Sequence, residues 1–195
     1  MTDDLDEPAL PGDHAHPLEP DEAATWAVIT DRVTSLAHRL REGGEVAQAD
    51  LTLPDIDIKR VLNALHIPDD AGPHAADLER ILRRIPDGWG RWIGCGKGWY
   101  PLIIDLDHRL AALDPTYWVH QVKEKYGTLC YYIATRGPQA ATMEAMVDQA
   151  EIASETICET CGESGVLMAH DSWLKTLCDT CGRATGYRPA QPGEA

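Results

Sequence analysis

Two nearly identical five-residue segments near the C-terminus constrain the fold of this chain most strongly. Cys158-Glu-Thr-Cys161-Gly returns, after sixteen residues between the inner cysteines, as Cys178-Asp-Thr-Cys181-Gly. A CxxCG turn directs two thiolates at one ion, and its glycine takes the unusual backbone angle of the turn. The spacing also matches the four-thiolate zinc template. The sequence therefore predicts one structural Zn²⁺ held by Cys158, Cys161, Cys178 and Cys181.

Other chemistries use similar cysteine pairs. A redox CxxC pair requires a thioredoxin-like βαβ context, and neither pair has one. HNH-type nucleases frame a catalytic histidine with two CxxC pairs, and His170-Asp171 lies between the pairs here. However, no second His or Asn follows in a helical segment, and "MAHDSW" favours a strand and a turn. A zinc deaminase would need an H-x-E motif, which the sequence lacks. Since four protein ligands leave no position for a catalytic water, the structural interpretation is favoured.

The charge of the chain is concentrated near its N-terminus. The formal net charge is -15 over 195 residues, and residues 1–31 contribute nine acids without a Lys or Arg. The remainder has 32 - 9 = 23 acids against 17 bases. An acidic chain is repelled by nucleic acid at long range, so the net charge disfavours a nucleic-acid partner. No apolar run approaches the roughly 20 residues that span a bilayer, and no signal peptide is visible, so we expect a cytoplasmic protein without a membrane partner.

The N-terminal part of the chain divides into a tail and a helical region. Residues 1–20 are rich in Pro and Asp and are expected to be a disordered acidic tail. Residues 21–86 show helical periodicity in three segments. The first begins at Asp21, the second covers 56–65 and the third covers 75–85. The third predicted helix carries Arg80, Arg83 and Arg84. A helix-turn-helix reader of DNA therefore remains an alternative interpretation.

Residues 87–157 predict a central α+β domain that contains most of the aromatic residues. A helix begins near Pro101 and ends at Asp114-Pro115, and two strands at 117–123 and 128–134 form a hairpin around Gly127. A long helix over 138–157 then runs directly into Cys158. A zinc ribbon is expected at 158–185 and a disordered tail at 186–195. Because helices and a hairpin both contribute to the core, the predicted fold class is α+β.

The glycine-rich segment and the hairpin are the predicted binding surface for a partner. Exposed tryptophan rings beside lysines are typical anchors of interfaces, although the three tryptophans concerned can equally belong to the core. The candidate residues are Trp89, Trp92, Lys97, Trp99, Lys123 and Lys125. "GCGKG" lacks the spacing and the Ser/Thr of a phosphate-binding loop. Asp105 and His108, which could bind metal together with Asp107, are expected on the exposed side of their helix.

Several segments together resemble a family of small, uncharacterised bacteriophage and prophage proteins. The resemblance covers residues 86–183 and is carried by "GWYPLIIDLDHRLAALDP", "QVKEKYGTLCYY", "AEIASETICETCG" and "WLKTLCDTCG". It implies a phage-like origin and this organisation, but no activity. We therefore expect a non-enzymatic, zinc-stabilised module that binds a host or phage protein. A nucleic-acid-associated regulatory protein or a degenerate HNH-like nuclease is the alternative.

Overall fold

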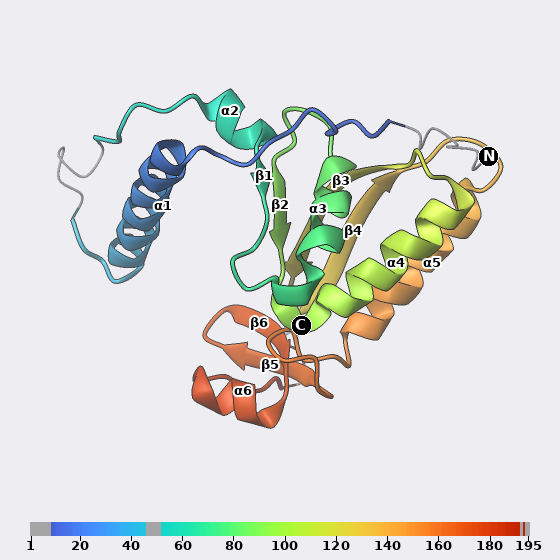
Figure 1. The fold of residues 1–195 in the computed structure, drawn as a ribbon. Coiled ribbons are helices and arrows are strands. Elements are labelled where there is room, and N and C mark those ends of the chain that lie inside the picture. The colour runs from blue at the N-terminus through green and yellow to red at the C-terminus, as the bar shows by residue number, and fades with distance from the viewer. Residues whose placement is uncertain (1–8, 46–51, 192, 194–195) are drawn as a thin grey trace.

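A four-stranded sheet with the order β1-β2-β3-β4 lies at the centre of the molecule (Figure 1). The structure is a computed structural model that describes residues 9–45, 52–191 and 193. β1 pairs with β2 and β2 with β3 in parallel, whereas β3 and β4 form an antiparallel hairpin. The strands are β1 (Leu65–His66), β2 (Arg91–Gly94), β3 (Trp118–Lys125) and β4 (Thr128–Ala134). The hairpin was predicted from the sequence, but β1 and β2 were not.

Three helices pack on one face of this sheet and enclose the main core (Figure 1). Val119, Val122, Leu129 and Tyr131 of the hairpin point into this core and are completely or almost completely buried. The short 3₁₀ helices Gly72–His74 and Lys97–Trp99 precede α3 and α4. The covering helices are α3 (Ala75–Arg83), α4 (Tyr100–Leu113) and α5 (Ala140–Ser154). The α+β prediction is therefore confirmed.

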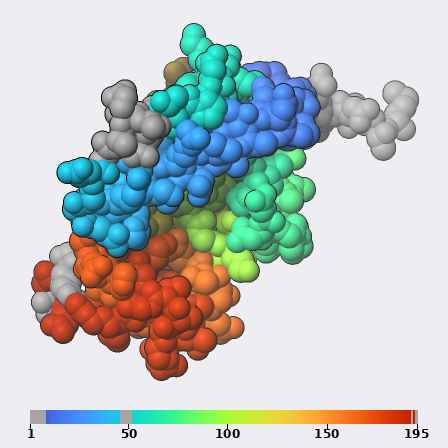
Figure 2. Space-filling model, turned by 90° about the vertical axis from the view of Figure 1, so that its left-hand side faces the viewer, coloured from blue at the N-terminus to red at the C-terminus, as the bar shows by residue number. Residues whose placement is uncertain are grey.

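Two further helices lie outside this core. α1 (Pro20–Arg41) lies beside the β1 edge and crosses one side of the molecule, in blue in Figures 1 and 2, and α2 (Ile58–Asn63) precedes β1. Ile29 is the one buried side chain of α1. A cavity of about 520 Å³, lined by Trp26, His66 and other residues, separates α1 from the sheet edge. The long helix therefore makes only a small contribution to the hydrophobic core.

The segment before α1 is not a disordered tail. Gly12 N–H donates to the carbonyl of Arg83 at 2.7 Å, and Leu65 N–H donates to that of His16 at 3.2 Å. The Arg83 guanidinium also donates to three carbonyls of this segment, and Ala15 is buried. Hydrogen bonds to the backbone thus hold a segment that has few apolar side chains. The prediction of disorder is wrong for residues 9–20, while residues 1–8 lie outside the described part.

The C-terminal unit contains a second sheet with the order β6-β5-β7. A turn at Asp171, whose φ is 52°, joins β5 (Val166–His170) to β6 (Trp173–Leu177), as "MAHDSW" predicted. α6 (Asp179–Ala184) follows, and β7 (Arg188–Pro189) pairs with β5. The expected disorder after 186 is therefore wrong for residues 186–191, since β7 belongs to the sheet. No helix in the described ranges is long and apolar enough to cross a membrane.

Candidate metal centre

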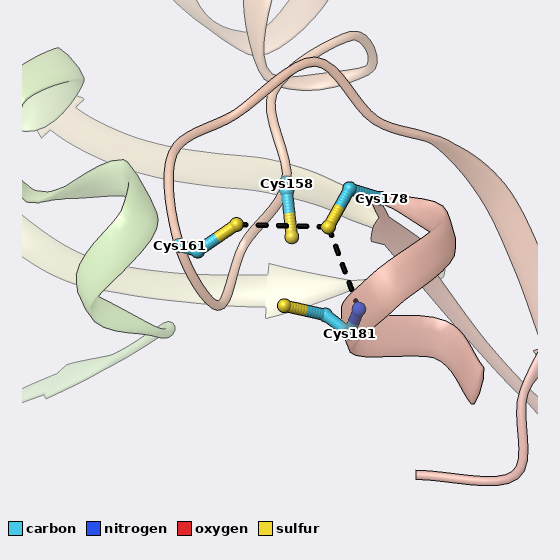
Figure 3. Close-up of side chains that lie close together, drawn as sticks. All are labelled: Cys158, Cys161, Cys178 and Cys181. Carbon is cyan, nitrogen blue, oxygen red and sulfur yellow. Dashed lines mark hydrogen bonds between the residues drawn. The ribbon is translucent and has the colours of Figure 1, made fainter. Parts of the chain in front are cut away.

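The four cysteines of the repeated segments converge on one point (Figure 3). Their Sγ atoms all lie within 4.8 Å of one another. The Sγ atoms of Cys161 and Cys178 are 3.7 Å apart, close to the about 3.8 Å between two thiolates on a tetrahedral zinc ion. A disulfide would bring two sulfurs to about 2.05 Å, and all six cysteines are free thiols. The cluster is therefore able to hold one metal ion.

The two cysteine pairs are presented by different local structures. The first pair lies in a turn after α5, where Gly162 donates to the Cys158 carbonyl at 2.9 Å and has a φ of 81°. The second pair lies at the start of α6, with Cys178 as its N-cap. Gly182 does not have the positive φ that the motif predicted. Close packing favours glycine there instead, because a Cβ would lie 2.2 Å from Sδ of the buried Met168, whose side chain would have to shift.

Hydrogen bonds within the cluster prepare one thiol for metal binding. The backbone N–H of Cys181 donates to Cys178 Sγ at 3.4 Å, and this bond lowers the pKa of Cys178 to about 7. The hydrogen bond between the Cys178 and Cys181 side chains raises the pKa of Cys181 to about 12. In the metal-free cluster Cys178 is therefore the preferred thiolate. Metal binding must release a proton from Cys181.

The glycine-rich segment before α4 supports the first cysteine pair. Gly98 N–H donates to the Glu159 carbonyl at 2.8 Å, and Gly96 N–H donates to Glu159 Oε1 at 2.9 Å. Glu159 is buried, and its other carboxylate oxygen accepts from Lys175 Nζ at 2.6 Å. The indole N–H of Trp99 donates to the carbonyl of Ile157 at 2.7 Å. The segment therefore fixes the cysteine turn to the central domain.

The predicted partner-binding residues do not share one environment. Trp99 is completely buried in the core, so its assignment to a binding surface is wrong. Trp92 is half-buried, whereas Trp89 is 53% exposed and stacks on His120 at 4.3 Å. Lys97 lines a small cavity together with Cys161, away from the sheet face. Lys125 is exposed and Lys123 half-buried, and both belong to β3.

The arginines of α3 are bonded within the molecule. Arg80 Nε and Arg84 Nε lie 3.0 and 2.6 Å from the carboxylate of Asp107, which is completely buried. Arg83 binds Glu79 and the segment before α1. These contacts leave the arginines poorly placed to read DNA. Asp105 and His108 are exposed, as predicted.

Sequence reasoning missed the buried role of Asp107. Its carboxylate also accepts from the hydroxyl of Tyr117, and burial raises the pKa of that tyrosine, so the hydroxyl stays protonated. The spacing of the sequence did indicate that Asp107 is buried, because it stands four residues after Ile103 and three before Leu110, on the apolar stripe of α4.

The other candidate site, His170-Asp171, stands apart from the cysteines. His170 is exposed and packs against the ring of Tyr187, with the ring centres 5.3 Å apart. Over residues 9–45, 52–191 and 193, the cysteine cluster is the one group of His, Cys, Asp or Glu side chains placed to hold a metal ion. Comparison of the chain with protein-family models, curated proteins and solved structures finds no match.

Proposed function

We propose that this chain is a non-enzymatic binding module in which one structural Zn²⁺ stabilises the C-terminal unit. The observation that carries the proposal is the convergence of four thiol groups at distances that suit a tetrahedral ion. A complete tetrahedral shell of four thiolates favours zinc over ions such as Mg²⁺, Ca²⁺ and Mn²⁺, which prefer oxygen ligands. Four protein ligands fill this shell, so the ion would hold the two cysteine pairs together and would not activate water.

The C-terminal unit depends on this ion because its own core is small. Cys158, Met168 and Leu177 form its buried cluster, with Cys178, Cys181 and Tyr187 packed against it. Three of these six residues are metal ligands. Such a core cannot offset the entropy of ordering the unit without a covalent or metal cross-link. Since the first pair is fixed to the central domain, zinc binding would order the second pair against a rigid support.

The internal pairing of the buried charges supports a binding role over a catalytic one. Asp107 is neutralised by Arg80 and Arg84, and Glu159 by Lys175. Groups paired in this way within the core stabilise the fold and do not reach a substrate. A host or phage protein is the first candidate partner and nucleic acid is the alternative. The resemblance to phage proteins supports a phage or prophage origin of the chain.

Metal analysis and hydrogen exchange test this proposal together. We expect one zinc ion per purified chain, and we expect Cys178→Ser to remove amide protection from Trp173–Leu177 while the β3–β4 hairpin remains protected. Cys130→Ser is the matched control, because Cys130 is half-buried and lies outside the cluster. Metal-free protein with full protection of β6, or a Cys178→Ser variant with unchanged protection, contradicts the proposal.

A further inference from the structure

The face of the central sheet opposite α3, α4 and α5 has an unusual composition. We call it the open face. The pairing register places Trp118 opposite Ala134, Gln121 opposite Tyr132, and Lys123 opposite Cys130 on this side. The register adds His66, Trp92 and Gly94 from β1 and β2, and Lys125 and Thr128 from the hairpin. His120 lies at the register shift between Val119 and Gln121 and joins the face through its stacking on Trp89. In a chain with 32 acids, none of these positions holds Asp or Glu, and none holds Leu, Ile, Val or Met.

The rings of Trp89, Trp118 and Tyr132 at the open face are exposed to solvent, whereas Trp92 is half-buried. Trp118 and Tyr132 are each 44% exposed. Trp89, from the loop before β2, is 53% exposed and lies parallel to the ring of His120, at an interplanar angle of 8°. Lys123 Nζ lies 5.5 Å from the centre of the Tyr132 ring. Exposed aromatic rings thus lie toward one end of the hairpin and lysines toward the other, and the two kinds of side chain meet where Lys123 lies beside Tyr132.

We propose that the open face binds single-stranded nucleic acid, with bases stacked on Trp89, Trp118 and Tyr132 and phosphates bound by Lys123 and Lys125. This inference rests on the proposed function, because it assigns a partner to the binding module. Unpaired bases stack on aromatic side chains, and cationic side chains beside the rings follow the backbone. Both kinds of side chain are present, and acids, which repel phosphate, are absent from the strand positions of the face.

The composition favours nucleic acid over a protein partner. The centres of protein interfaces are depleted of charged side chains, lysine among them, whereas Lys123 lies beside the Tyr132 ring on this face. The strand positions of the open face provide aromatic, amide, hydroxyl and cationic groups without a large aliphatic side chain. The negative net charge weakens the long-range attraction between the chain and nucleic acid. However, nine of the acids lie in residues 1–31, a part of the chain that contributes no residue to the open face. Local contacts at the face therefore decide the binding.

Fluorescence anisotropy of the full chain with labelled 12-nucleotide oligo(dT) and oligo(U) tests the proposal. We expect saturable binding at 50 mM salt and much weaker binding to a duplex of the same length. Two phosphate contacts predict a roughly sevenfold loss of affinity between 50 and 200 mM salt. Trp118→Ala and Tyr132→Ala should each weaken binding by about 5- to 150-fold, because each removes a stacking surface. Lys123→Gln should reduce the dependence of affinity on salt.

Matched substitutions elsewhere serve as controls. Lys59 is exposed on α2 and Lys97 is exposed before α4, and both lie outside the strand positions of the open face, so Lys59→Gln and Lys97→Gln should leave binding unchanged. The proposal is overturned if neither oligonucleotide binds, if the duplex binds equally well, or if both ring substitutions leave the affinity unchanged. If the open face binds a protein instead, neither oligonucleotide should bind. Zinc content and amide protection are measured without an oligonucleotide, so the two proposals fail separately.

Discussion

Gly98 lies directly against Cys158: a Cβ on Gly98 would be 2.1 Å from the carbonyl oxygen of Cys158. The next nearest atom, Gly162 N, would be 2.5 Å away. Both contacts are with backbone, which cannot move aside as a side chain can. The glycine-rich segment is therefore the surface on which the first cysteine turn packs, and it links the candidate metal centre to α4.

We expect Gly98→Ala to destabilise the protein by about 2–3 kcal/mol, because the methyl group forces the cysteine turn away from the core. Chemical denaturation measures the loss, and zinc affinity should fall with it. Gly94→Ala is the control, since its Cβ would lie 3.2 Å from Lys123 Cβ and 3.3 Å from the Val122 carbonyl oxygen, which is a tight contact but not an overlap. Equal effects of the two substitutions would show that Gly98 has no special packing role.

Asp107 is the charged group on which the packing of α3 against α4 depends most. Asp107→Ala leaves the buried guanidinium of Arg84 without its carboxylate, and such a loss costs about 3–5 kcal/mol. Asp105→Ala, two residues earlier on the same helix, removes only an exposed contact with Arg109 at 3.6 Å. Its effect should stay within about 0.5 kcal/mol. Thermal unfolding of both variants distinguishes these outcomes.

The lowered pKa of Cys178 predicts which thiol reacts first in metal-free protein. Because the pKa is about 7, the thiolate fraction rises as the pH increases through this value, below the range of an ordinary cysteine. Iodoacetamide should therefore modify Cys178 first, with a rate that reaches half its maximum near pH 7. Peptide mass spectrometry gives the site and the rate. Zinc should protect Cys178, and a midpoint near pH 8.5 contradicts the prediction.

The sequence predicted the elements whose patterns are local. The CxxCG segments, the helix that begins near Pro101 and the hairpin around Gly127 each carry their own spacing and turn signals. The convergence of the four cysteines followed from spacing alone, because two short ligand turns around one ion leave few arrangements. The metal's supporting surface was not predicted, since Gly96 and Glu159 are 63 residues apart in the chain.

Elements that depend on distant partners escaped prediction. β1 has two residues and β2 has four, and each is ordered by parallel pairing with a neighbouring strand. The segment before α1 reads as disordered because its partner is the Arg83 guanidinium and not an apolar face. Asp107 interrupts an apolar stripe, and only the spatial position of Arg84 explains why a charge is tolerated there.

Trp99 and Trp118 offer the sharpest comparison between core and surface. Trp99 is completely buried, and its indole N–H donates to the carbonyl of Ile157, directly before Cys158 of the cysteine cluster. Trp99→Ala should cost about 3–5 kcal/mol of stability, because it leaves a large cavity and removes this hydrogen bond. Trp118 is 44% exposed, so Trp118→Ala should change stability by less than about 1 kcal/mol.

The two variants should also differ in how they hold metal. Loss of Trp99 frees the end of the segment that presents Cys158, so zinc transfer to a chromogenic chelator should be faster than in the unsubstituted protein. Trp118 lies on the hairpin and does not belong to the cysteine cluster, so its removal should leave the transfer rate unchanged while oligonucleotide binding is weakened. If Trp99→Ala unfolds the chain, Trp99→Phe keeps most of the ring volume and removes only the N–H donor. A transfer rate that is unchanged in Trp99→Phe would show that the hydrogen bond to Ile157 does not support the metal centre.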